Sequence, residues 1–204
     1  LTANAWTLAS QLYCTMTAEG DGAWINSYAV DSNGTVYMVT SHTTEDSGGS
    51  GAPTPGPYST LFRIPAADAI ATVPRGSGMD RLPYEIHAIE SLNGSIYMFG
   101  SEHLGYKKNR QVVIKYPNTV VWRSRKITTS VSSKENIQVR AIFKSGDGII
   151  FIANADDSYY DSAYLLTFSD TVREIMPVVK STTESVLTAA IGEINGQILT
   201  FERG

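Results

Sequence analysis

Four segments of the chain repeat one pattern of apolar and polar residues. In each, an apolar run leads into Asn-Gly or Asp-Gly, and a run alternating β-branched or aromatic residues with others follows. The segments are 27–39, 87–99, 140–152 and 188–200. Alternation with a period of two is typical of strands, and Asn-Gly or Asp-Gly supplies the positive φ angles of a type I′ turn. Each segment is therefore predicted to be a two-residue β-hairpin.

The turn glycines recur at a spacing that indicates a repeat. Gly34, Gly94, Gly148 and Gly196 are separated by 60, 54 and 48 residues. Each of the first three hairpins is followed by two more strand-like segments, namely 59–64 and 69–73, 111–116 and 119–127, and 163–168 and 171–176. A repeat of about 50 residues with four strands has the size of a β-propeller blade. The sequence thus predicts an all-β propeller of about four four-stranded blades in a single domain, 1–204.

The fourth predicted blade has only two strands at the C-terminal end of the sequence. The first three blades span about 26–74, 84–128 and 137–177, and the fourth is made of 186–204 and 4–16. The strand-like N-terminal segment is expected to close the ring, which removes a bare edge strand. The alternative is that these are four blades of a larger propeller. The Gly-, Ser- and Pro-rich segment 45–57 is predicted to be a surface loop within the first blade.

Residues 92–100, Leu-Asn-Gly-Ser-Ile-Tyr-Met-Phe-Gly, followed by Tyr116 and Trp122, resemble a kelch-type blade. Blades of that family have an aromatic strand that ends in a glycine doublet, and a spaced Tyr and Trp follow it. Here Ser101 follows Gly100 in place of the second glycine. The resemblance implies a propeller, and such propellers are mostly binding platforms, with some oxidases among them. Sialidase-like propellers need a Ser-x-Asp-x-Gly-x-x-x-Trp turn, which this sequence lacks.

Composition narrows the class of protein further. Hydrophobic residues make up 42% and charged residues 18% of the 204 residues, which excludes wholesale disorder. No apolar run approaches the ~20 residues of a membrane-spanning helix. The net charge of -4 argues against a general nucleic-acid binder, and the small basic cluster 107–110 is predicted to be a solvated loop tip. A single cysteine, Cys14, excludes an internal disulfide.

The hydroxyl-rich composition bears on where the protein acts. The 21 serines and 20 threonines make a mixture that is common in secreted and virion-surface proteins. The chain starts at Leu1 and not at Met, which favours a processed product or a piece of something longer. We therefore expect an extracellular or virion-surface location, within a larger assembly that contains other subunits or domains.

Candidate binding residues follow the second strand of each predicted blade. In a propeller, the loops that join the second and third strands of all blades emerge together on one face. Residues far apart in the sequence therefore become neighbours there. The candidates are His42, Asp46, Glu102, His103, Tyr106, Asp156, Asp157, Tyr159 and Tyr160. Seven carboxylates fall in the same positions, namely Glu45, Asp46, Glu102, Asp156, Asp157, Asp161 and Glu202.

Three interpretations of these residues stay open. In the first, the loops are polar only because they face water. In the second they form a recognition face, where Tyr106, Tyr159 and Tyr160 stack on sugars or side chains and the acids accept hydrogen bonds. The third is a metal or acid/base site built from four side chains, those of His42, His103, Asp156 and Asp157, whose spacing is not diagnostic.

The prediction from sequence is a non-enzymatic binding or structural module that recognises a protein or glycan ligand. It includes no cofactor, no resident metal, no nucleic acid and no insertion into a membrane. The alternative is a glycan-processing enzyme, similar to a glycoside hydrolase, that uses carboxylates on the same face.

Overall fold

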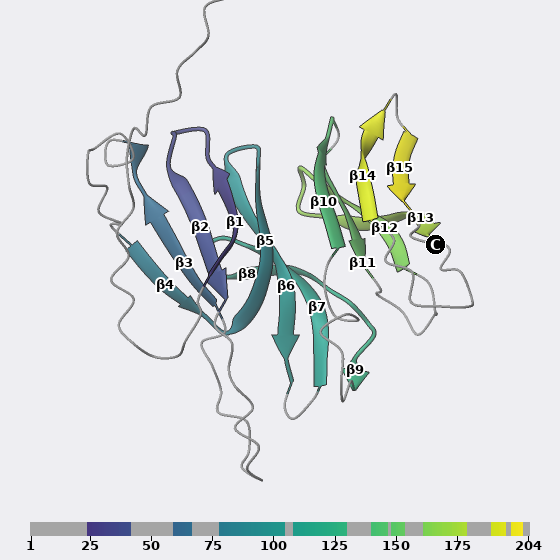
Figure 1. Ribbon diagram of the computed structural model, residues 1–204, viewed down its shortest axis with the longest axis horizontal. Helices are drawn as coiled ribbons and strands as arrows, with labels where there is room; N and C mark the ends of the chain where they lie inside the picture. Colours follow the sequence, from purple (N-terminus) through teal and green to yellow (C-terminus); the bar gives the residue numbers. More distant parts are fainter. Residues whose placement is uncertain are drawn as a thin grey trace, which may run out of the picture.

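A computed structural model describes residues 24–41, 59–66, 78–104, 108–129, 140–146, 148–153, 161–178, 189–194 and 197–201. Within these ranges the protein is all-β, as predicted, and its strands form three antiparallel sheets, each with a row of four strands, and a two-stranded pair; a short extra strand makes the second sheet five-stranded (Figure 1). The described part contains no helix of the length and apolarity that crossing a membrane requires.

The first sheet has the order β1-β2-β3-β4. Its strands are β1 (Trp24–Val30), β2 (Val36–Ser41), β3 (Ser59–Ile64) and β4 (Gly78–Leu82). The fourth strand was expected at 69–73, which lies outside the described residues. The strand that pairs with β3 is instead β4, with Leu61 opposite Asp80. The first unit therefore extends to Leu82, beyond the predicted end at 74.

The second and third sheets lie where the repeat predicted them. The second contains β5 (Tyr84–Leu92), β6 (Ser95–His103), β7 (Lys108–Lys115) and β8 (Thr119–Arg123), and the short β9 (Thr128–Thr129) also pairs with β7. The third contains β10 (Arg140–Ser145), β11 (Gly148–Ala153), β12 (Asp161–Thr167) and β13 (Val172–Val178). The final pair is β14 (Ala189–Ile194) and β15 (Gln197–Phe201).

The hairpin turns agree with prediction in part. Leu92 pairs with Ser95, so Asn93 and Gly94 form the expected two-residue turn, with φ angles of 48° and 74° that suit type I′. In the first unit Val30 pairs with Val36, so the link spans residues 31–35 and the prediction of a two-residue turn is wrong there. The Asp31 carboxylate accepts hydrogen bonds from the amides of residues 33 and 35, which stabilises this longer turn.

The third turn is shifted by one residue from its predicted place. Ser145 pairs with Gly148, so the two linking residues are 146–147 and not Asp147-Gly148. Gly148 itself begins β11 with a φ of 154°. A Cβ atom added there would lie 1.9 Å from the carbonyl oxygen of Leu166, so only glycine allows β12 to approach this closely.

Successive sheets pack face to face and divide the core into layers. One cluster lies between the first and second sheets and includes Val39, Leu61, Ile89 and Met98. The next lies between the second and third sheets, where Phe99 and Trp122 contact the ring of Phe151 at centroid distances of 5.3 and 5.4 Å. A third cluster covers the other face of the third sheet. Each layer exists because alternate residues of a strand point to opposite faces.

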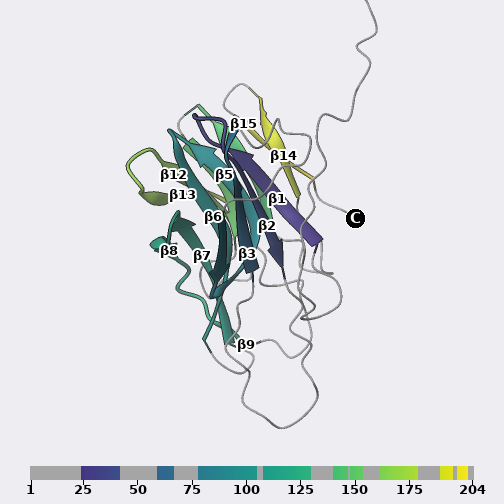
Figure 2. The ribbon, with the colours of Figure 1, turned by 90° about the vertical axis from the view of Figure 1, so that its left-hand side faces the viewer.

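The first strands of successive sheets are neighbours. The Ser27 hydroxyl on β1 accepts a hydrogen bond of 3.1 Å from the amide of Ile89 on β5. Lys144 on β10 lies 3.2 Å from the carboxylate of Glu90 on β5, and β14 lies beside β10 (Figure 1). The sheets thus follow one another in a row, with the first sheet and the β14–β15 pair at its opposite ends (Figure 1), and Figure 2 looks along this row from the side of the first sheet. The predicted closing strand, 5–16, lies outside the described residues.

Candidate functional site

Three second strands end on the same side of their sheets. The arrowheads of β2, β6 and β11, which end at Ser41, His103 and Ala153, all point to one edge, the lower one in Figure 1. We call this the loop edge. Of the predicted binding residues, Glu102 and His103 lie there on β6. The others, His42, Asp46, Tyr106, Asp156, Asp157, Tyr159 and Tyr160, lie outside the described residues.

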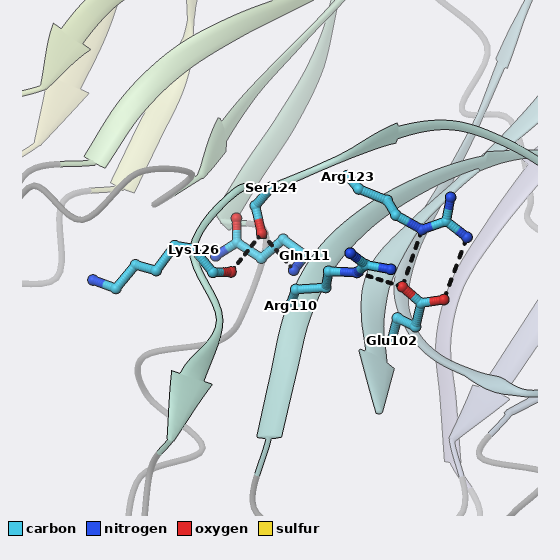
Figure 3. Close-up of polar contacts among 6 residues, drawn as sticks. All are labelled: Glu102, Arg110, Gln111, Arg123, Ser124 and Lys126. Atoms are coloured by element: carbon cyan, nitrogen blue, oxygen red, sulfur yellow. Dashed lines mark hydrogen bonds and ion pairs between the residues drawn. The ribbon is translucent and has the colours of Figure 1, made fainter. Parts of the chain in front are cut away.

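Glu102 is the centre of an ion cluster at the loop edge. Arg110 is its direct partner on β7, and Arg123 extends from β8 (Figure 3). The Glu102 carboxylate oxygen Oε2 lies 2.6 Å from Nε of Arg110 and 3.1 Å from Nε of Arg123, while Oε1 lies 3.3 Å from Nη2 of Arg123. Figure 3 shows the carboxylate lying between the two guanidinium groups. We call these three residues the Glu102 cluster.

Electrostatics keeps the Glu102 cluster charged. Burial by itself would raise the pKa of Glu102, but the hydrogen bonds from Arg123 and Arg110 outweigh it and lower that pKa. The same carboxylate raises the pKa of Arg123. Two guanidinium groups therefore share one ionised carboxylate, and the cluster carries one net positive charge. A carboxylate held ionised in this way cannot serve as a proton donor at neutral pH.

The opposite face of the second sheet carries a different set of polar residues. Nε2 of His103 on β6 lies 3.3 Å from Oε2 of Glu85 on β5, and Nε2 of His87 lies 3.4 Å from the hydroxyl of Ser101. Burial lowers the pKa of His87, Glu85 raises it in part and His103 lowers it further. Glu102 and His103 are consecutive, so they point to opposite faces of the sheet. The structure therefore does not join them in one site.

Buried hydrogen bonds fix the chain that leaves β8. The Ser124 hydroxyl accepts from the amide of Gln111 at 3.0 Å and donates to the carbonyl oxygen of Lys126 at 3.0 Å. The Ser124 amide donates to the Gln111 carbonyl oxygen at 2.9 Å. Figure 3 shows this pair beside, and separate from, the Glu102 cluster. These bonds hold β8 against β7, which places Arg123 within reach of Glu102.

The metal interpretation gains no support from the described part of the chain. There, no group of three or more histidine, cysteine, aspartate or glutamate side chains is arranged to hold a metal ion. Among the four side chains proposed as ligands, only His103 is described, and its neighbour is Glu85.

Neither arginine was among the binding residues predicted from the sequence. Residues 107–110 were expected to be a solvated loop tip, but Lys108 to Arg110 belong to β7 and Arg110 is paired with Glu102. The available signal was the strand order: with β6, β7 and β8 adjacent, a charge near the end of each strand meets its neighbours. Only the register places these charges side by side.

Comparisons with known proteins identified no relative of this chain. Searches with protein-family models, against curated proteins and against solved structures gave no match to this chain. The likeness to kelch repeats therefore rests on residues 92–100, Tyr116 and Trp122 alone, and the site has to be judged from its own geometry.

Proposed function

We propose that the chain is a non-enzymatic binding module, built as a β-propeller, that recognises a glycan at the loop edge. The repeated four-stranded sheets and the adjacency of β1, β5, β10 and β14 support a propeller, because the first strands of successive blades line its axis. In this proposal β14 and β15 form the inner half of a fourth blade, which residues 4–16 complete.

Exposed apolar side chains on β1 support ring closure. Ala29 belongs to the core between the first two sheets, so its neighbours on β1 point to the other face. There Tyr28 is 70% exposed and Val30 is 44% exposed. A closing blade would cover these apolar side chains, as the third sheet covers the second.

The observation that carries the binding proposal is the shared edge of β2, β6 and β11. It supports the gathering of the segments that follow these strands, which contain Tyr106, Tyr159 and Tyr160 in the sequence. Aromatic rings beside hydrogen-bonding groups are a common way of binding sugars. The polar groups of the Glu102 cluster lie at the same edge.

The electrostatics of Glu102 bears on its use in the enzymatic alternative. A glycoside hydrolase needs one protonated carboxylic acid beside a second carboxylate. Glu102 is held ionised by two arginines, which is unsuited to the acid role. We further propose that the module acts outside the cell or on a virion surface, as one part of a larger assembly.

The test is a glycan array probed with the wild-type chain and with Tyr106→Ala and Tyr159→Ala. We expect a defined set of glycans to bind the wild type and to lose at least tenfold in affinity with one or both variants. Phe168→Ala is the control, because this exposed aromatic residue follows β12 at the opposite edge. Absence of any bound glycan, or equal binding by all four proteins, would overturn the proposal.

A further inference from the structure

Among the described residues, the Glu102 cluster differs from the other ion pairs in its charge balance. Arg63 with Asp80, Lys115 with Asp170 and Lys144 with Glu90 each match one cation with one carboxylate. At the loop edge, two arginines share a single carboxylate. The cluster therefore has an unmatched positive charge that a second anion could neutralise.

The two arginines also have hydrogen-bond donors that do not contact Glu102. Within the described part of the chain, Arg110 donates to Glu102 through Nε alone, and Arg123 donates through Nε and Nη2. No described residue accepts a hydrogen bond from either Nη group of Arg110 or from Nη1 of Arg123, so these donors remain for another acceptor. Both Nε atoms lie within 3.1 Å of one oxygen, so the two guanidinium groups are close enough to contact one small anion.

The surroundings strengthen such an interaction and leave it accessible. Tyr84 lies opposite Glu102 on β5 and is only 9% exposed, so the cluster rests on a buried base where water screens charge less. Arg123 is 41% exposed and lies on β8, the last strand on its side of the sheet, so its guanidinium can be reached from solvent.

We infer that Arg110 and Arg123 bind an acidic group of the ligand, which makes the recognised glycan an acidic one. This inference rests on the proposed glycan-binding function. The planar guanidinium matches a carboxylate or a sulfate through two parallel hydrogen bonds, and such bonds between charged groups are stronger than those between neutral groups. Glu102 then acts as a positioning residue that holds the two guanidinium groups side by side.

The experiment compares matched pairs of glycans that differ in one acidic group. Glucuronate-terminated and glucose-terminated oligosaccharides form one pair, and 6-sulfated and unsulfated galactosides form the other, which separates the two sources of negative charge. Titration calorimetry is run with the wild type, Arg123→Gln, Arg110→Gln and Arg63→Gln. Arg63 is the matched control, because it is paired with Asp80 and is 39% exposed, close to the 41% of Arg123.

We expect the wild type to bind at least one acidic member about tenfold or more tightly than its neutral partner. Arg123→Gln and Arg110→Gln should abolish that preference, while Arg63→Gln should keep it. Equal binding of acidic and neutral members overturns this inference but leaves glycan binding intact. A preference unchanged in both loop-edge variants also overturns it. Failure of every glycan to bind overturns the proposed function as well.

Discussion

Lys115 on β7 and Asp170 in the turn after β12 join the second and third sheets, with Nζ of the lysine 2.8 Å from Oδ2 of the aspartate. The hydroxyl of Tyr97 on β6 also donates to Asp170. One turn residue thus receives hydrogen bonds from two strands of the neighbouring sheet. The hydrogen bond from Lys115, followed by that from Tyr97, lowers the pKa of the Asp170 carboxyl.

Asp170→Asn should lower the free energy of unfolding by less than about 1 kcal/mol, because the partly exposed ion pair is screened by water. Asparagine tolerates the φ of 61° found at this position, so the backbone is preserved and the loss reports the charge. A carboxyl with a lowered pKa stabilises the fold above its unfolded value of about 3.9. The difference between wild type and variant in urea unfolding should therefore be full at pH 7.

The same difference should disappear as the pH falls through the lowered pKa of Asp170, since the carboxylate is then protonated in both states. An undiminished difference in strong acid would show that the stabilisation by Asp170 does not depend on its charge.

Gly100→Ala tests a close approach within the second sheet. A Cβ atom at Gly100 would lie 2.1 Å from the carbonyl oxygen of Glu85, where a bulge between Ile86 and Ala88 brings β5 close to β6. Backbone has to move to make room, so we expect a loss of about 3 kcal/mol in unfolding free energy. Gly146→Ala is the control, because nothing lies within 4 Å of its added Cβ.

Urea denaturation monitored by circular dichroism measures both glycine variants. The control should change by no more than about 0.5 kcal/mol. If the Gly100→Ala protein were as stable as the Gly146→Ala protein, this would show that β5 does not approach β6 as closely as described.

Trp122→Ala tests the packing between the second and third sheets. The indole contacts Phe151 and Tyr164 at centroid distances of 5.4 and 5.3 Å, so truncation should cost about 3 kcal/mol. A double-mutant cycle with Phe151→Leu should give a coupling energy of about 1 kcal/mol, as expected for an aromatic pair. A coupling energy of zero would mean that the two rings do not touch.

We predict a second dependence of stability on pH, which is caused by His87 and is separate from that caused by Asp170. Burial lowers the pKa of His87 below the ordinary value of about 6.5. As the pH falls from 6.5 toward the lowered pKa, the unfolded chain takes up a proton that the folded chain refuses, so the free energy of unfolding falls. His87→Gln should lack this component.

Unfolding of both proteins at pH 7.5 and at pH 5 measures the effect of His87. The wild type should lose more stability than His87→Gln between these values. Equal losses would show that the fold does not hold His87 in its neutral form.

The hairpins were predictable because their signal is local. Asn93-Gly94 between alternating strands can form little other than a type I′ turn, and the structure has it. The predicted fourth strand of the first unit was misplaced because 69–73 is richer in apolar residues than β4, whose sequence is Gly-Met-Asp-Arg-Leu. As the last strand of its sheet, β4 is defined by pairing with β3, which composition does not reveal.

The Glu102 cluster could not be predicted from the sequence, for a related reason. Arg110 and Arg123 meet Glu102 only through the register of three strands, and a bulge between Val113 and Ile114 helps to set the position of Arg123. A shift by one residue would send the side chains of a strand to the other face. Glu102 was predictable from its place after an apolar run, whereas its partners were not.

The most direct test of the account is an NMR titration of the 15N-labelled chain with a glycan selected on the array. Binding at the loop edge predicts amide shift changes near Ser41, His103, Arg110 and Arg123, with little change at the turns around Gly94 and Asp170 on the opposite edge. Shift changes centred on those opposite turns, with the loop edge unaffected, would contradict the account.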